Sequence, residues 1–177
     1  MKIREITRPE MDDAKPLLYK AGWNFLGSGA YADVFEKPGV NYILKLFEDR
    51  DNGYKRYLSL ISQRRNKHFP ILRGRPMKIN SVYWAVRMEK LQPINSTTDW
   101  EVVANGERYL RILESGSHEY TGFVQQYVAS YPDMAQALEL ILRFVIVGGS
   151  YLDLGYNNVM KRLDGTLVII DPAGGGR

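Results

Sequence analysis

Two acids and an amide near the end of the sequence have the residue types and spacing of a phosphoryl-transfer site. Asp153 is followed five positions later by Asn158, in a D-x-x-x-x-N pattern, and Asp171 comes thirteen residues after that. Magnesium prefers hard oxygen ligands, while a remaining carboxylate can orient the hydroxyl group that attacks a phosphate. Asn158 and Asp171 are therefore candidate metal ligands, and Asp153 is the candidate catalytic residue.

The segment between Asn158 and Asp171 predicts a β-hairpin that would bring these two residues side by side. Leu163-Asp164-Gly165-Thr166 is a turn sequence, with Asp-Gly joining two short strands, and the apolar run 167–170 leads into Asp171. Asp153 would then face the two ends of the hairpin. In the structural alternative, Asp153 caps a turn, Asp171 ends a buried strand, and neither does chemistry.

A glycine-rich turn is the second candidate site element. Gly27-Ser28-Gly29-Ala30 separates predicted strands at 23–26 and 31–36, and a third strand is predicted at 42–47. Glycine lets the backbone approach phosphate oxygens because no side chain stands in the way. Lys45, the only charge in the third strand, could reach the same phosphates. An ordinary glycine turn with an edge lysine is the alternative.

The first domain, residues 1–91, predicts a β-sheet with two helices. A capping-box spacing at 7–10 indicates a short helix, which Pro16 should interrupt. Apolar positions at helical spacing between 51 and 65 predict an amphipathic helix. Two more strands are expected, at 71–79 and 82–88.

The second domain, residues 92–177, is predicted to be mainly helical. One helix is expected from Thr98 to Glu114, and Ser130 is placed to cap a strongly apolar helix that reaches Val145. Between the domains the chain leaves the sheet at Met88 to Leu91, where backbone groups could bind a flat base. The tail Gly174-Gly175-Gly176 is expected to be flexible.

Composition excludes several classes of protein. The 177 residues are 45% hydrophobic, which is enough for a packed core. The absence of cysteine excludes a disulfide framework and a zinc–thiolate site, and His68 and His118 are too far apart in sequence to favour a histidine metal site. There is no long uncharged apolar stretch and no signal peptide, so no membrane association and a cytoplasmic location are expected. The net charge of +4 predicts mild attraction to phosphates.

In their order, these parts resemble the protein-kinase fold: glycine-rich hairpin, strand lysine, helix, hinge, apolar helix, D-x-x-x-x-N loop, hairpin and final Asp. The resemblance covers nearly the whole chain, and it is strongest to the small serine/threonine protein kinases of short-tailed lytic bacteriophages. It implies an α+β, protein-kinase-like two-lobe fold, with an antiparallel β N-lobe and a reduced, mainly helical C-lobe. It also implies ATP and Mg²⁺ as cofactors, and host bacterial proteins as substrates in the host-cell cytoplasm.

The resemblance also assigns roles to residues. Gly27 and Gly29 would cover the phosphates, and Lys45 would bind the α and β groups. The segment from Met88 to Leu91 would hold adenine through backbone groups. The full set of implied nucleotide-binding residues is Gly27, Ser28, Gly29, Ala30, Val34, Lys45, Met88, Glu89 and Leu91. At the other end of the sequence, Asp153 would be the catalytic aspartate, with Asn158 and Asp171 holding magnesium.

Several positions depart from the family pattern. The His-Arg pair that usually precedes the catalytic aspartate is Tyr151-Leu152, and the lysine that usually follows it by two residues is Gly155. The Phe-Gly that usually follows the metal aspartate is Pro172-Ala173. Because Gly155 replaces the usual lysine, one positive charge that would stabilise the transition state is missing. Because Leu152 replaces the usual arginine, no cation is present there to bind the phosphate of a phosphorylated loop.

Two further departures concern the first helix and the end of the sequence. No Glu occurs between Glu48 and Glu89, so the usual Lys–Glu ion pair is missing or is rebuilt from Asp49 or Asp51. The sequence runs only six residues beyond Asp171, without the activation segment of the family. Substrate binding is then organised differently, or a partner contributes, or the chain is a fragment.

Three other functions remain open. Small-molecule phosphotransferases of the aminoglycoside or choline kinase type share the Asp/Asn/Asp core, but they usually carry a His where this chain has Gly155. A pseudokinase that binds and inhibits a host protein is favoured by the missing lysine and Glu, and opposed by the intact Lys45 and Asp153. A nucleic-acid binder is suggested by a basic run, although such runs are usually solvated and no aromatic platform accompanies this one. Its residues are Arg56, Arg64, Arg65, Lys67, Arg73, Arg75 and Lys78. The sequence does not specify an oligomeric state.

Overall fold

The computed structural model of the chain describes residues 11–116, 121–146 and 149–176. Contacts divide the chain into two compact units. The first unit consists of Met1–Asp51 and Ile71–Lys90, and the second consists of Asn52–Pro70 and Leu91–Arg177. The first unit is built on an antiparallel sheet and the second is mainly helical, so the predicted α+β class is confirmed.

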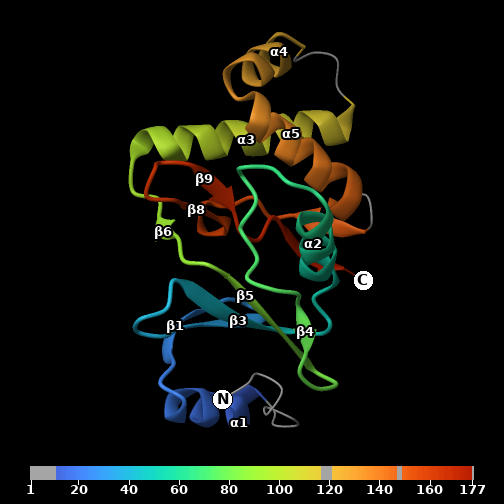
Figure 1. Cartoon of the computed structure of the whole chain (residues 1–177). Coiled ribbons are helices and arrows are strands. Elements are labelled where there is room, and N and C mark those ends of the chain that lie inside the picture. Colours follow the sequence, from blue (N-terminus) through green and yellow to red (C-terminus); the bar gives the residue numbers. More distant parts are fainter. Residues whose placement is uncertain (1–10, 117–120, 147–148, 177) are drawn as a thin grey trace. The chain divides into compact units, whose positions relative to one another are not determined.

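A five-stranded antiparallel sheet forms the first unit, with strand order β1-β2-β3-β5-β4 (Figure 1). The element order, with a helix between β3 and β4 in sequence, is the order expected of the predicted protein-kinase-like fold. The elements are α1 (Met11–Lys20), β1 (Asn24–Ser28), β2 (Ala32–Glu36), β3 (Tyr42–Glu48), β4 (Met77–Lys78) and β5 (Tyr83–Glu89).

Helix α1 packs on one face of this sheet through Leu18, which is 1% exposed. The buried cluster comprises Leu18, Phe35, Leu44, Leu46 and Ala85. The prediction that Pro16 interrupts the helix is wrong, because α1 continues through it to Lys20. Pro16 itself is exposed, and burial of Leu18 two residues later stabilises the last turn. The predicted helix start at 7–10 lies outside the described residues.

The strand predicted at 71–79 is mostly irregular. Only Met77–Lys78 pairs as a strand, and Leu72 forms an isolated bridge with Met88. Between them Gly74 has a φ of +111°, and Pro76 has no N–H to donate to a ladder. These two residues interrupt the strand that is predicted at 71–79.

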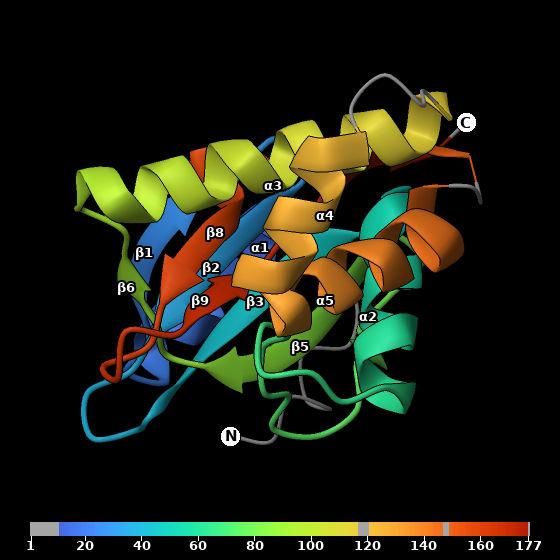
Figure 2. The same cartoon turned by 90° about the horizontal axis from the view of Figure 1, so that it is seen from above.

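The second unit contains the main helices, and α3, α4 and α5 pack against one another (Figure 2). Its helices are α2 (Asn52–Gln63), α3 (Thr97–Ser115), α4 (Thr121–Ser130), α5 (Pro132–Ile141), the π-helix η2 (Leu142–Ile146) and the 3₁₀-helix η3 (Tyr156–Asn158). Two small antiparallel sheets complete it, with orders β6-β8-β9 and β10-β7. Their strands are β6 (Gln92–Pro93), β7 (Ser150–Leu152), β8 (Val159–Lys161), β9 (Leu167–Ile169) and β10 (Ala173–Gly176).

The helix predicted from Thr98 is α3, and it begins one residue earlier, after the cap Ser96. The sequence pattern did not predict α4, whose one buried residue is Tyr127. The predicted cap Ser130 is wrong, because Ser130 ends α4 and the N-cap of α5 is Tyr131. Pro at the first turn starts α5 instead, since its fixed φ suits a helix and its missing N–H has no partner there.

Helix α2 belongs to the second unit, whereas the sequence pattern predicts it as part of the first domain. Tyr54 and Tyr57 on its inner face are fully buried. Gly53 allows the helix to approach β10, because a Cβ at this position would lie only 3.0 Å from the carbonyl oxygen of Ala173. In the tail that is predicted to be flexible, Gly174 pairs with Tyr151 in the sheet formed by β10 and β7.

No helix within the described ranges is both long and apolar enough to cross a membrane.

Candidate functional site

The hairpin of β8 and β9 brings Asn158 and Asp171 together, as predicted. Val159 pairs with Ile169, and the N–H of Ile170 donates to the carbonyl oxygen of Asn158 at 2.8 Å. The N–H of Asp171 points to the same oxygen at 3.4 Å. The predicted Asp-Gly turn closes the other end, where Gly165 has a φ of +87° that favours glycine.

Backbone and side-chain hydrogen bonds attach Asp153 to both ends of this hairpin. Its N–H donates to the carbonyl oxygen of Pro172 at 2.9 Å, and the Asn158 Nδ2 donates to its carbonyl oxygen at 2.7 Å. Leu154, 3% exposed, anchors the loop in the core, whereas the Asp153 side chain is exposed. The structure therefore brings Asp153, Asn158 and Asp171 into one hydrogen-bonded segment, with a carboxylate available to solvent.

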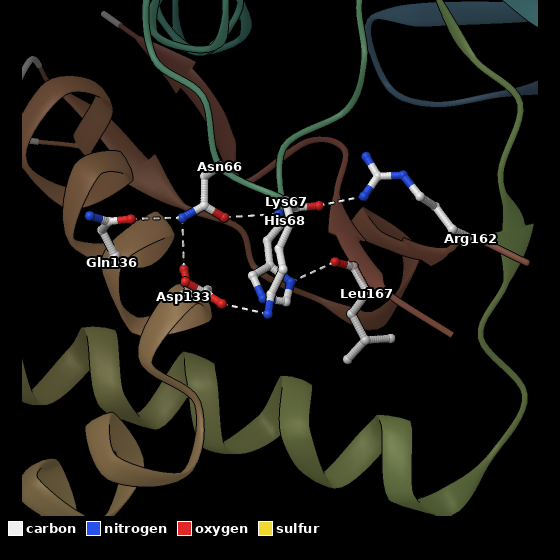
Figure 3. Close-up of polar contacts among 7 residues, drawn as sticks. All are labelled: Asn66, Lys67, His68, Asp133, Gln136, Arg162 and Leu167. Carbon is white, nitrogen blue, oxygen red and sulfur yellow. Dashed lines mark hydrogen bonds and ion pairs between the residues drawn. The ribbon is translucent and has the colours of Figure 1, made fainter. Parts of the chain in front are cut away.

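A loop far away in sequence supports β9, the strand that leads to Asp171 (Figure 3). The carbonyl oxygen of His68 accepts the N–H of Ile169 at 2.9 Å, and the Tyr57 hydroxyl donates to the carbonyl oxygen of Ile169. The His68 Nδ1 lies 2.7 Å from the carbonyl oxygen of Leu167. Since a carbonyl only accepts, Nδ1 carries the proton. Burial lowers the pKa of His68, which favours this neutral form.

The same loop is joined to helix α5. The Asn66 Nδ2 donates to the Asp133 carbonyl oxygen at 2.8 Å and to the Gln136 Oε1 at 3.2 Å (Figure 3). Lys67 forms an ion pair with the Asp133 carboxylate. Arg162 of the hairpin donates to the carbonyl oxygens of Lys67 and Phe69. Sequence reasoning missed these supporting residues, because each bond spans many positions and no local pattern marks it.

In the first unit, Lys45 lies in the middle of the sheet and is 8% exposed. It pairs with Val34 on β2 and with Val86 on β5, so these three side chains share one sheet face. Leu44 and Leu46 point to the opposite face, where α1 packs.

The glycine turn between β1 and β2 is closed by a hydrogen bond from the N–H of Gly29 to the carbonyl oxygen of Ala32, at 2.8 Å. Neither Gly27 nor Gly29 has a positive φ. Within the described part of the chain, nothing lies within 4 Å of a Cβ built at either position. Ser28 and Ala30 of the turn are exposed. Internal packing therefore gives no reason for the two glycines, whereas close approach of a ligand would.

Part of the predicted adenine-binding segment already forms hydrogen bonds within the first unit. The N–H of Glu89 donates to the carbonyl oxygen of Ile71 at 2.9 Å, and the Glu89 Oε1 accepts the N–H of Ile71 at 2.8 Å. Met88 is 3% exposed and pairs with Ile43. Lys90 and Leu91 follow the end of β5 at Glu89.

One of the two acids proposed to pair with Lys45 already has partners on its own sheet. The Asp49 Oδ1 accepts the Trp84 Nε1 at 2.6 Å, and the Oδ2 accepts the Lys78 Nζ at 2.9 Å. The other acid, Asp51, is 7% exposed.

The donor set fits a magnesium ion that is bound together with a phosphate ligand. Asn158 and Asp171 supply one amide and one carboxylate oxygen from adjacent positions. Among the described residues, no group of three or more His, Cys, Asp or Glu side chains could hold a metal ion. Magnesium in phosphoryl-transfer sites usually takes one or two protein ligands and completes its shell with phosphates and water. Two protein ligands are therefore enough for a magnesium ion that is also coordinated by phosphate and water, although they are too few for a site made of protein ligands alone.

Comparison with known proteins gives similarity only at the level of solved structures. No protein-family model matches the sequence, and no curated protein matches it. One similar structure is Rad53 residues 1–466 in complex with AMP-PNP, at 17% identity and a TM-score of 0.41, covering 90% of this chain and 42% of that one. Another is the Cydia pomonella granulovirus kinase PK-1, at 13% identity and a TM-score of 0.42, covering 92% and 58%. The chain thus spans less than two thirds of either protein.

Proposed function

We propose that the chain is an ATP- and Mg²⁺-dependent phosphotransferase, a protein kinase that phosphorylates serine or threonine hydroxyls of host bacterial proteins. One observation carries the proposal: hydrogen bonds join Asp153, Asn158 and Asp171 into a single segment, with the N–H of Asp153 on Pro172 and the amide of Asn158 on Asp153. A catalytic carboxylate and two oxygen donors are the protein groups that this chemistry requires.

Each residue of the segment has one role in the proposal. The exposed Asp153 carboxylate orients the substrate hydroxyl and accepts its proton. Asn158 and Asp171 hold the magnesium ion, which neutralises charge on the phosphate oxygens when it is bound. Because the loop is hydrogen-bonded at both ends, Asp153 is positioned before a substrate arrives.

In the first unit, Gly27 and Gly29 are the proposed backbone contacts of the phosphates. Neither has a positive φ, and a Cβ at either position would meet no atom within 4 Å in the described part of the chain. Lys45 is the proposed cation for the α and β groups, and the half-buried Val34 beside it offers an apolar surface to an adenine ring.

The test is transfer of labelled phosphate from ATP, with magnesium, to proteins of a bacterial lysate. We expect labelling by the natural chain and a loss of about 100-fold or more in Asp153→Ala. Glu107→Ala is the matched control, since Glu107 is an acid of the same unit that pairs only on the surface of α3 with Arg111. Absence of both ATP binding in calorimetry and phosphate transfer would refute the proposal. Binding without transfer would instead support the pseudokinase alternative.

A further inference from the structure

One face of α2 carries polar groups that the proposed function does not use. Arg56, Ser59, Leu60 and Gln63 have the spacing of one side of the helix. Arg64 directly follows the last residue of α2, and its N–H donates to the carbonyl oxygen of Leu60 at 2.9 Å. Together with Phe144 of η2 they line a half-open groove of about 170 Å³. Both elements belong to the second unit and contact each other (Figure 2).

The groove is cationic. Its lining contains two arginines and no carboxylate, and no acidic residue occurs in the sequence between Asp51 and Glu89. Among the described residues, neither Arg56 nor Arg64 forms an ion pair with a carboxylate. The Arg56 Nη1 donates to the Ser150 Oγ at 3.4 Å, and this bond helps to position the Arg56 side chain. The positive charge of the two guanidinium groups is therefore available to an anion.

Neutral hydrogen-bond donors lie between the two arginines. The Gln63 Nε2 donates to the Ser59 Oγ at 3.1 Å, so the hydroxyl hydrogen of Ser59 remains able to donate to a ligand. Arginine forks and hydroxyl groups are the usual partners of phosphate oxygens. The polar half of the groove thus has the donors of a phosphate site.

The other half of the groove is apolar and aromatic. Leu60 is 6% exposed and forms a floor, whereas Phe144 is 44% exposed although it lies beside the core. Phe144 belongs to a π-helical turn, a conformation that is uncommon and often found at functional sites. The Arg143 guanidinium lies 5.4 Å from the centre of the Phe144 ring, which adds a cation next to this surface.

We propose that this groove binds an aryl phosphate monoester, the chemistry of a phosphotyrosyl side chain. The phosphoryl group lies between Arg56 and Arg64, where Ser59 donates to it, and the aromatic ring rests on Leu60 and Phe144. The groove is too small for a nucleoside triphosphate, since drug-sized ligand pockets begin at about 300 Å³. The site shares no residue with the proposed catalytic segment, so it stands or falls independently of the proposed function.

Phenyl phosphate and inorganic phosphate are the probes, titrated into the whole chain by calorimetry at low salt with saturating ATP and magnesium. We expect phenyl phosphate to bind more tightly than inorganic phosphate, and ATP not to displace it. Arg64→Gln should weaken phenyl phosphate about tenfold or more. Arg65→Gln is the matched control, because the neighbouring residue has the same charge but does not line the groove. Phe144→Leu should weaken phenyl phosphate and leave inorganic phosphate unchanged.

Three results would overturn the proposal. Equal losses in Arg64→Gln and Arg65→Gln would mean unspecific attraction to a basic surface. Equal affinities for phenyl and inorganic phosphate would remove the aromatic half of the site. Displacement of phenyl phosphate by ATP would place it at the nucleotide site instead. Arg64 is exposed, so its replacement should leave the fold intact, and a thermal melt of each variant checks this.

Discussion

The side-chain amide of Asn158 donates a hydrogen bond to the backbone carbonyl of Asp153, with 2.7 Å between the two atoms. In Asn158→Asp, a carboxylate oxygen would replace the amide N–H that donates to the Asp153 carbonyl, so two acceptors would face each other. The carboxylate could still serve as an oxygen ligand for a cation. We expect a loss of stability of about 1 kcal/mol and a much larger loss of phosphate transfer. Urea unfolding and the transfer assay measure the two effects. Transfer at the natural level would show that this bond does not position Asp153.

Asp171→Asn should separate chemistry from folding. The amide is nearly isosteric, and the backbone bond of Asp171 to Asn158 is unaffected by the change. We expect a change in melting temperature of only a few degrees and a loss of transfer that added magnesium restores in part, since one charged ligand is gone. Full turnover at low magnesium would remove Asp171 from the proposed metal site.

Gly155→Lys tests whether the missing cation limits the reaction. Gly155 has φ −75° and ψ 165°, which any residue adopts, and a Cβ there would lie 3.9 Å from the Asp153 Oδ1. A lysine could therefore extend beside the carboxylate of Asp153, the proposed catalytic group, without backbone strain. We expect transfer to rise several-fold, because a positive charge stabilises the transferring phosphoryl group. Gly155→Gln, of similar length without charge, is the control. Equal rates in the two variants would contradict an electrostatic role for this position.

His68 should make stability depend on pH. Burial lowers its pKa in the folded state below the usual value of about 6.5, so the unfolded chain binds the proton more readily. The contribution of neutral His68 is complete above about pH 6.5 and declines as the pH falls through that value towards the folded pKa. We expect the melting temperature to drop between pH 7 and pH 5.

His68→Asn is the matched variant for this titration. The Asn Nδ2 can replace the Nδ1 donor to Leu167 but does not titrate. The other histidine, His118, is present in both proteins, so the difference between the two pH profiles isolates His68. Parallel profiles would assign the pH dependence to other groups.

Tyr127→Phe should stabilise the protein. The Tyr127 hydroxyl is buried and has no hydrogen-bond partner among the described residues. Its removal relieves a desolvation cost, so we expect a gain of about 1 kcal/mol in the free energy of unfolding.

A Cβ at Gly106 would lie 2.9 Å from the Tyr127 hydroxyl oxygen. Gly106→Ala should therefore destabilise the natural chain more than the Tyr127→Phe variant. A double-mutant cycle with no coupling would contradict this contact.

The sequence alone determined those features that depend on near neighbours in the chain. The hairpin from Asn158 to Asp171 follows from an Asp-Gly turn between two short apolar runs, and its ends must meet whatever surrounds them. The glycine turn of 27–30 and the amphipathic helix α2 are local in the same sense. The adjacency of Asn158 and Asp171 was therefore predictable.

Only the tertiary structure decided which distant segments meet. Ala173 lies against Gly53, far away in sequence, and the glycine run after it forms a strand because β7 offers free backbone partners. His68 and Tyr57 support β9 through hydrogen bonds that no sequence pattern predicts. Phe144 completes a groove on α2 only because the helix end bearing it packs there. Such contacts depend on where other segments of the backbone lie and on how much area they bury. The periodicity of a single segment carries no information on either.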